Sequence, residues 1–195
     1  MMLPPIIRVF FAIDLPQSIR DSVSRFMGSL KKNAKSHAIR WVRPENLHIT
    51  LQFLAEVRAE HLSQMLANVR QELEGVVKNS SISFTEVHLF PSVFRPRVIV
   101  LGVKPQEELV RLAELIGRGI KASHYDIENR LFRPHLTLGR IKQPFSTNLK
   151  FLSAAVVPVM EAISVNEVAL FYSEPRPEGS RYTVIERIGW CLPMT

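Results

Sequence analysis

The sequence predicts an α+β fold made of two pseudo-symmetric lobes. Short runs of β-branched and aromatic residues, which favour strands, outnumber the three long segments with helical spacing of apolar residues. One strand-helix-strand unit also occurs twice along the chain. The 195 residues, 46% of them hydrophobic, are enough to bury a sizeable core. We therefore expect one bilobal domain that spans residues 1–195.

In the first half of the chain, predicted strands alternate with predicted helices. Residues 8–15 are β-branched and aromatic and stop at Pro16, which predicts a strand followed by the first turn of a helix. Apolar residues then recur at helical intervals from Gln17 to about Lys32. Residues 48–54 alternate as in a strand, and residues 58–77 carry a second helical stripe.

The second half repeats this alternation with weaker signals toward its end. The expected elements are strands at residues 82–90 and 98–103, a helix at 105–121, a strand at 130–141, a short helix at 147–157, and strands at 163–172 and 182–189. The last two strands are joined by a turn rich in proline and glycine, as in a hairpin.

The two copies of the repeated unit end in the same landmarks. In each copy a strand, a proline and a helix lead to an Arg-x-x-Arg-Pro sequence, at residues 40–44 and 130–134. A histidine follows, His48 in the first copy and His135 in the second. Two lobes related by approximate two-fold symmetry would bring such matching residues together across a cleft.

Each histidine begins a His-x-Thr motif on a predicted strand. Because side chains alternate along a strand, His48 and Thr50 share one face, and so do His135 and Thr137. Chance predicts only about 0.2 such pairs in a chain of this composition. Two imidazoles and two hydroxyls can supply a general base, a general acid and phosphate ligands. The motifs therefore indicate phosphodiester cleavage without a metal.

The charge of the chain favours a polyanionic partner. The formal net charge is +7, and 17 arginines stand against 8 lysines. Guanidinium binds phosphate in a bidentate manner, which suits nucleic acid. The alternative is that these charges only solvate the surface.

Several classes of protein are disfavoured by the sequence. Cys191 is the single cysteine, so an intrachain disulfide and a multi-cysteine metal site are excluded. The remaining histidines are not paired at metal-ligand spacing, and we expect no metal. The first apolar stretch, residues 6–15, is too short to span a bilayer. We expect a cytoplasmic protein with no membrane partner.

The two motifs, with the stretches at residues 8–16, 40–48 and 132–140, resemble the 2H phosphoesterases. Within this superfamily they are most similar to the RNA 2′,3′-cyclic phosphodiesterases, also called 2′-5′ RNA ligases. The resemblance implies two lobes of antiparallel sheet, flanked by helices, around a central cleft. It also implies hydrolysis of an RNA 2′,3′-cyclic phosphate to a 2′-phosphate without a cofactor, and reversible 2′-5′ ligation. The implied partners are RNA ends, tRNA halves among them, and we expect a monomer.

The resemblance also assigns roles to individual residues. His48 is implied to be the proton donor and His135 the proton acceptor. Thr50 and Thr137 are implied to hydrogen-bond the phosphate, and so is Arg140.

Strand alternation opposes the role of Arg140, because it places this residue on the face of Leu136 and Leu138. A bulge at Gly139 would turn the side chain of Arg140 toward the cleft. The alternative is that Arg140 is only a charge on the surface.

Three further residues are candidates for the cleft. Phe11 matches an aromatic position that stacks a nucleobase in relatives, although a core position is the alternative. Arg43 and Arg133, each before a proline, either line the cleft or lie at its rim.

Two other functions remain open at this point. One is a 2H phosphoesterase that acts on a small cyclic nucleotide. The other is an RNA-end-binding module without catalysis, whose histidines only hold phosphate.

Overall fold

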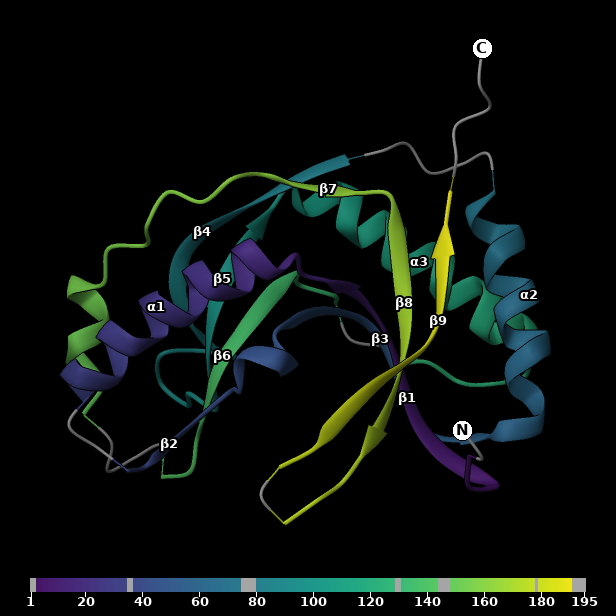
Figure 1. Cartoon of the computed structure of the whole chain (residues 1–195), viewed down its shortest axis with the longest axis horizontal. Helices are drawn as coiled ribbons and strands as arrows, with labels where there is room; N and C mark the ends of the chain where they lie inside the picture. Colours follow the sequence, from purple (N-terminus) through teal and green to yellow (C-terminus); the bar gives the residue numbers. More distant parts are fainter. Residues whose placement is uncertain are drawn as a thin grey trace.

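Two antiparallel sheets form the framework of the molecule (Figure 1). The computed structural model describes residues 3–34, 37–74, 80–128, 131–143, 148–177 and 179–190. The first sheet has the strand order β3-β1-β8-β9, and the second has the order β2-β6-β5-β4-β7. The strands are β1 (Ile6–Asp14), β2 (Ile39–Trp41), β3 (His48–Arg58), β4 (Ser80–Phe90), β5 (Val98–Lys104), β6 (His135–Ile141), β7 (Ile163–Val165), β8 (Glu167–Glu174) and β9 (Arg181–Gly189).

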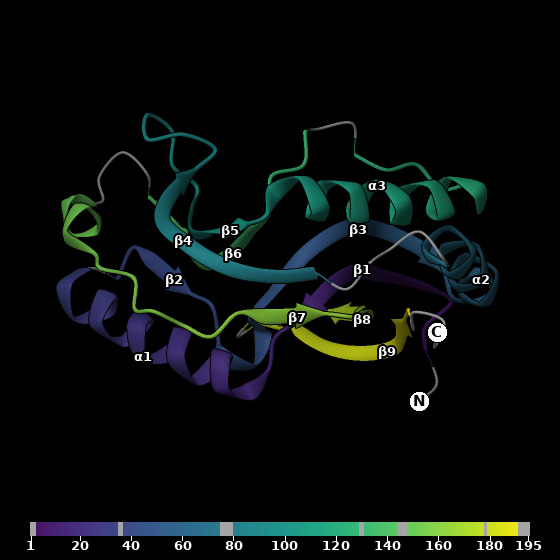
Figure 2. The same cartoon turned by 90° about the horizontal axis from the view of Figure 1, so that it is seen from above.

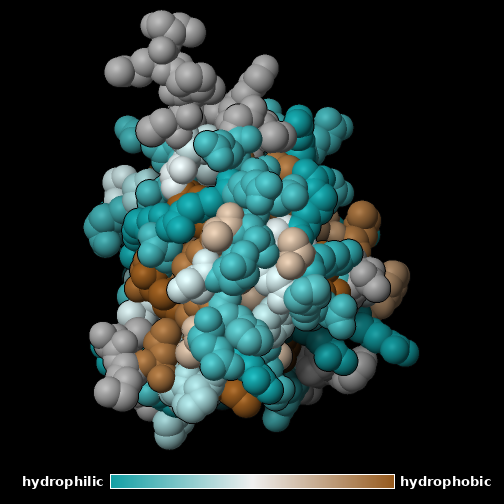
Figure 3. Space-filling model, turned by 90° about the vertical axis from the view of Figure 1, so that its right-hand side faces the viewer, coloured by the Kyte–Doolittle hydropathy of each residue, from teal (hydrophilic) through white to brown (hydrophobic). Residues whose placement is uncertain are grey.

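Three α-helices flank the sheets, α1 (Gln17–Ala34), α2 (Leu62–Leu73) and α3 (Gln106–Ala122). Each buries one apolar stripe, as Val23, Met27 and Leu30 of α1 illustrate. The outer surface around α2 is largely hydrophilic, with hydrophobic residues in scattered places (Figure 3). Short 3₁₀ turns lie at η1 (Pro44–Asn46), η2 (Ala59–His61) and η3 (Lys150–Ala154).

The predicted duplication is present in the fold. Strand β1, helix α1 and strand β3 of the first copy correspond to β5, α3 and β6 of the second. In both sheets the histidine-bearing strand pairs with the first strand of its own copy. Strands β3 and β6 approach each other where the two sheets meet. The α+β bilobal prediction is therefore confirmed.

The lobes exchange elements with each other (Figures 1 and 2). Helix α3 follows β5 of the second sheet but packs on β3 of the first, where Gln52 Nε2 donates a 2.9 Å hydrogen bond to the carbonyl oxygen of Ala113. Helix α1 follows β1 of the first sheet and lies beside the second. Strand β2, from the first copy, pairs with β6 at the edge of the second sheet.

Some predicted boundaries differ from the structure. The predicted strand at residues 163–172 is two strands, because the chain leaves β7 at Val165 and enters the other sheet at Glu167. The short helix expected at 147–157 is the 3₁₀ turn η3, and β6 begins only at His135. Strand β2 was not predicted. None of the helices in the described part of the chain has the length and apolar character needed to cross a bilayer.

Candidate active site

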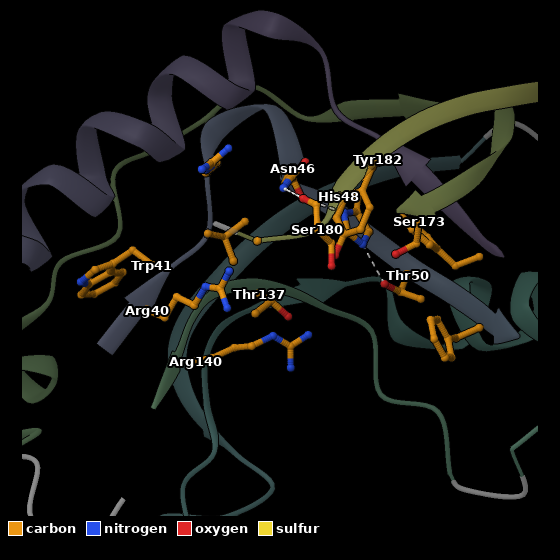
Figure 4. Close-up of a pocket in the computed structure, with 15 residues that line it drawn as sticks. Arg40, Trp41, Asn46, His48, Thr50, Thr137, Arg140, Ser173, Ser180 and Tyr182 are labelled. Carbon is orange, nitrogen blue, oxygen red and sulfur yellow. Dashed lines mark hydrogen bonds between the residues drawn. The ribbon is translucent and has the colours of Figure 1, made fainter. Parts of the chain in front are cut away.

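A cavity of about 430 Å³ lies between the two sheets (Figure 4). His48 and Thr50 reach it from β3, and Thr137 and Arg140 reach it from β6. Its volume falls in the range of roughly 300–1,000 Å³ that is usual for small-molecule sites. Four of the six residues that the sequence singles out as catalytic or substrate-binding therefore share one cavity.

His48 is held by hydrogen bonds at both ring nitrogens. Its Nδ1 lies 2.7 Å from the carbonyl oxygen of Asn46, and a carbonyl can only accept, so Nδ1 carries the hydrogen. In the neutral ring Nε2 is then an acceptor, and the Thr50 hydroxyl donates to it over 3.0 Å. The nitrogen that faces Thr50 is therefore the one available for proton transfer.

Aromatic side chains enclose His48 on the first sheet. Its ring centroid lies 4.6 Å from that of Phe10, 5.3 Å from that of Tyr182 and 6.0 Å from that of Phe171, which also stacks on Phe10 at 5.0 Å. This burial lowers the pKa of His48 from 6.5 to about 4. His48 is consequently neutral near pH 7 in the ligand-free protein.

Other groups also act on the pKa of His48. The hydrogen bond to Asn46 and the charge of Asp14 raise it, whereas the charges of Arg140 and Arg20 lower it. A bound phosphate would add a negative charge and shift this pKa upward.

His135 repeats part of the His48 arrangement. Its Nδ1 donates a 2.7 Å hydrogen bond to the carbonyl oxygen of Arg133, which lies two residues earlier, as Asn46 does relative to His48. Its ring stacks on Phe90 at 5.4 Å. His135 is partly exposed and does not belong to the lining of the cavity, although Thr137, two residues along the same strand face, does.

A bulge in β6 brings Arg140 to the cavity. Ile99 pairs with Gly139 and Val100 with Thr137, so Leu138 has no partner on β5 and the alternation shifts by one residue. Arg140 is therefore exposed and lines the cavity, whereas Leu136 and Leu138 are buried. The strict alternation argument against Arg140 is wrong because of this bulge.

The prediction for Phe11 requires a correction. Phe11 is fully buried, with 0% of its surface exposed, and does not line the cavity. Its neighbour Phe10 faces the cavity but is covered by His48, Phe171 and Tyr182. The exposed aromatic ring in the lining is that of Phe53, which is 40% exposed and lies five residues after His48, as Arg140 lies five after His135.

The two arginines that precede prolines lie in different places. Arg43 lines the cavity. Arg133 lines a separate groove against α3, and its backbone carbonyl accepts the hydrogen bond from His135.

Several lining residues were missed from the sequence. Asn46 Nδ2 donates a 2.9 Å hydrogen bond to the carbonyl oxygen of Ser180, which ties the turn before His48 to the β8–β9 hairpin (Figure 4). Ser173, Tyr182 and Arg40 also line the cavity. The sequence signal near Ser173, Ser180 and Tyr182 was the proline- and glycine-rich hairpin, which indicated a turn rather than a site. Arg40 belongs to the Arg-x-x-Arg-Pro landmark at residues 40–44, which was not interpreted as part of the cavity.

No cluster of three His, Cys, Asp or Glu side chains suitable for a metal occurs within the described ranges. Cys191 lies outside the described residues. The polar groups of the cavity are thus imidazole, hydroxyl, amide and guanidinium, a set that suits an anion with oxygen ligands.

Comparison with known proteins agrees with this geometry. The model of the family described as LigT-like phosphoesterase matches residues 13–100 and 101–182. An RNA 2′,3′-cyclic phosphodiesterase from Methanothermobacter thermautotrophicus is 34% identical, over 92% of this chain and 97% of the relative. One from Escherichia coli is 30% identical, over 95% and 96%. The crystal structure of Escherichia coli LigT in apo form superposes with a TM-score of 0.78 at 27% identity, over 97% of this chain and all of that one.

Proposed function

This chain belongs to the LigT-like phosphoesterase family, and we propose that it hydrolyses the 2′,3′-cyclic phosphate at the end of RNA to a 2′-phosphate. The observation that carries the proposal is the shared cavity, to which one lobe contributes His48 and Thr50 and the other Thr137 and Arg140. The relatives named RNA 2′,3′-cyclic phosphodiesterase support the same substrate. We place the reaction in a cytoplasmic monomer that needs no cofactor.

The proposed reaction begins with the binding of the cyclic phosphate. Arg140 and the Thr137 hydroxyl bind the non-bridging oxygens, and the negative charge raises the pKa of His48 above its ligand-free value of about 4. Once Nε2 of His48 is protonated, it no longer accepts from Thr50. The Thr50 hydroxyl is then free to donate to the phosphate.

Proton transfer then uses both histidines. Nε2 of His135 accepts a proton from water as the water oxygen bonds to phosphorus. The bond between phosphorus and O3′ breaks, and O3′ leaves with the electron pair and takes the proton from Nε2 of His48. Both Nδ1 atoms donate to backbone carbonyls, so both Nε2 atoms are available for proton transfer. The product is a 2′-phosphate with a free 3′-hydroxyl.

The same steps account for ligation. If the 5′-hydroxyl of a second RNA takes the place of water, breaking the bond to O3′ yields a 2′-5′ linkage. The two halves of a cleaved tRNA would supply such a pair of ends.

The test is an assay of an oligoribonucleotide with a 2′,3′-cyclic phosphate end. Phosphorus NMR of the product should show a 2′-phosphate only, because O3′ is the proposed leaving group. Formation of a 3′-phosphate would contradict the direction of opening. Saturable binding without turnover would instead support a non-catalytic RNA-end-binding module.

A further inference from the structure

Two arginines lie side by side in the wall of the cavity. Arg40 on β2 is the direct cross-strand partner of Arg140 on β6. Both line the cavity, and both project to the same side of it, next to Thr137 (Figure 4). Like charges directly opposite each other on neighbouring strands destabilise a sheet. An anion bound between or beside them would remove this repulsion.

Arg40 has no carboxylate partner within the described ranges of the chain. Among the described residues no Asp or Glu lines the cavity, and Arg40 forms no ion pair. Arg140 is likewise without an ion pair in that part of the chain. The pair therefore presents two positive charges to a ligand.

The β8–β9 hairpin lies directly against the guanidinium of Arg40. Gly179 has a φ of 127°, which favours glycine, and a β-carbon at this residue would lie 2.5 Å from Nη2 of Arg40. The backbone of the hairpin thus closes directly against the guanidinium. This close approach limits the directions in which Arg40 can point, and the cavity is one of them.

The cyclic phosphate does not need both arginines. It carries one negative charge, and Arg140, Thr50 and Thr137 already provide a cation and two hydroxyl donors for it. Arg40 lies one strand farther from β5, toward the edge of the second sheet. From Arg40, Val42 and Arg43 extend the lining along the protein chain toward Asn46, and Val42 N donates to the carbonyl oxygen of Leu138, beside Thr137.

We propose that Arg40 forms a subsite, beside Arg140, for the phosphodiester that joins the terminal nucleotide to the one before it. The inference rests on the proposed function and narrows its substrate class. The preferred substrate is then a chain of at least two nucleotides rather than a free cyclic mononucleotide. The RNA chain then leaves the reaction centre past Arg40, toward the edge of the second sheet.

The experiment compares three substrates with the same terminal nucleotide. The first is adenosine 2′,3′-cyclic phosphate, and the second is the adenosine dinucleotide with a 2′,3′-cyclic end. The third is that dinucleotide with a methylphosphonate, which is neutral, in place of the internal phosphodiester. For the wild-type protein, kcat/KM should be at least about tenfold higher for the natural dinucleotide than for the methylphosphonate, as expected for one charged hydrogen-bonded contact.

Two variants locate the contact. Arg40→Gln should remove the difference between the two dinucleotides, and it should lower kcat/KM for the natural dinucleotide by more than it lowers kcat/KM for the mononucleotide. Arg111→Gln, at an exposed position of α3 outside the cavity, makes the same change of charge and should retain the difference. Circular dichroism and thermal unfolding of each variant report on its folding.

The outcomes separate the two proposals. Equal kcat/KM for both dinucleotides in the wild type would overturn the subsite without any variant, and so would a difference that survives Arg40→Gln. If none of the three substrates is hydrolysed by the wild type, the proposed function fails. Hydrolysis of all three at equal rates leaves the proposed function intact and rejects the subsite.

Discussion

Asp14 lies directly opposite His48 on the neighbouring strand of the first sheet, whereas the residue opposite His135 in the second sheet is Gly102. The two histidines therefore differ in the strand residue beside them, although their copies match in topology. A carboxylate beside His48 favours the imidazolium, which is the form that an acid needs. The asymmetry agrees with the role of proton donor that we propose for His48.

The state of His48 should change when phosphate binds. Its pKa of about 4 lies below the ordinary value of 6.5, so the ligand-free ring should stay neutral as the pH falls from 7 to about 5. Adenosine 2′-phosphate should raise this pKa, because the ligand charge stabilises the imidazolium. Nitrogen-15 NMR of the imidazole in both states measures the effect. Titration of the ligand-free ring near pH 6.5 would contradict the burial argument.

Removal of the Asp14 charge should lower the pKa of His48. Asp14 is bound by Arg20 and by Arg187, whose Nη2 lies 2.6 Å from Oδ2. Asp14→Asn removes the carboxylate and leaves both cations, so the pKa of His48 in the complex with adenosine 2′-phosphate should fall. Glu167→Gln is the matched control, because Glu167 binds the other side of the Arg187 guanidinium. An unchanged pKa in Asp14→Asn would reject the electrostatic role.

The two histidines should respond differently to the leaving group. His48→Ala and His135→Ala should each lose about two to four orders of magnitude in turnover of RNA. A substrate with an activated leaving group at the 3′ position needs no acid and should rescue His48→Ala alone. Rescue of His135→Ala instead would reverse the two roles, and more than about a tenth of wild-type activity in either variant would reject the pair.

Chelation should leave turnover unchanged. The reaction that we propose uses imidazole, hydroxyl and guanidinium groups of the chain, and no step needs a metal-bound water. Activity is measured after exhaustive dialysis against EDTA and again after addition of Zn²⁺ or Mg²⁺. A loss that added metal restores would reopen a metal-dependent mechanism.

Two helical glycines should respond to alanine in opposite directions. A β-carbon at Gly119 of α3 would lie 2.6 Å from the Cα atom of Val69 on α2, so Gly119→Ala should push the helices apart and reduce the free energy of unfolding by at least about 1 kcal/mol. Gly28 of α1 has open space where a β-carbon would lie. Gly28→Ala should therefore increase the free energy of unfolding by about 0.5–1 kcal/mol. Urea denaturation of both variants gives the comparison. If Gly119→Ala left the free energy of unfolding unchanged, α2 would be able to shift away from α3 without loss of stability.

The local patterns of the sequence were sufficient to identify most of the strands, the long helices and both His-x-Thr motifs. Strand β2 was not predicted, because its three residues, Ile39, Arg40 and Trp41, are too few to establish alternation. The break between β7 and β8 at Asn166 was not predicted, because the apolar run continues on both sides of it. The sheet order shows that the chain passes from one lobe to the other there.

The details of the site depend on tertiary contacts that no local pattern records. The bulge at Leu138 reverses the expected direction of Arg140, and strand alternation alone cannot decide which of Phe10 and Phe11 is fully buried. The pKa of His48 follows from its enclosure by Phe10, Phe171 and Tyr182, which lie on three different strands. Arg40 enters the cavity only because β2 crosses to the second lobe.

The exchange of elements between the lobes also bears on how such a chain could have arisen. A single copy of the repeated unit would leave β2 without β6 and would leave its long helix without the sheet that it covers. The half-length ancestor of a gene duplication would therefore have needed a second molecule to complete its core. An intertwined homodimer with two equivalent histidines satisfies this requirement. In a single chain that holds both copies, the residues beside the two histidines need not be the same, and here they are Asp14 and Gly102.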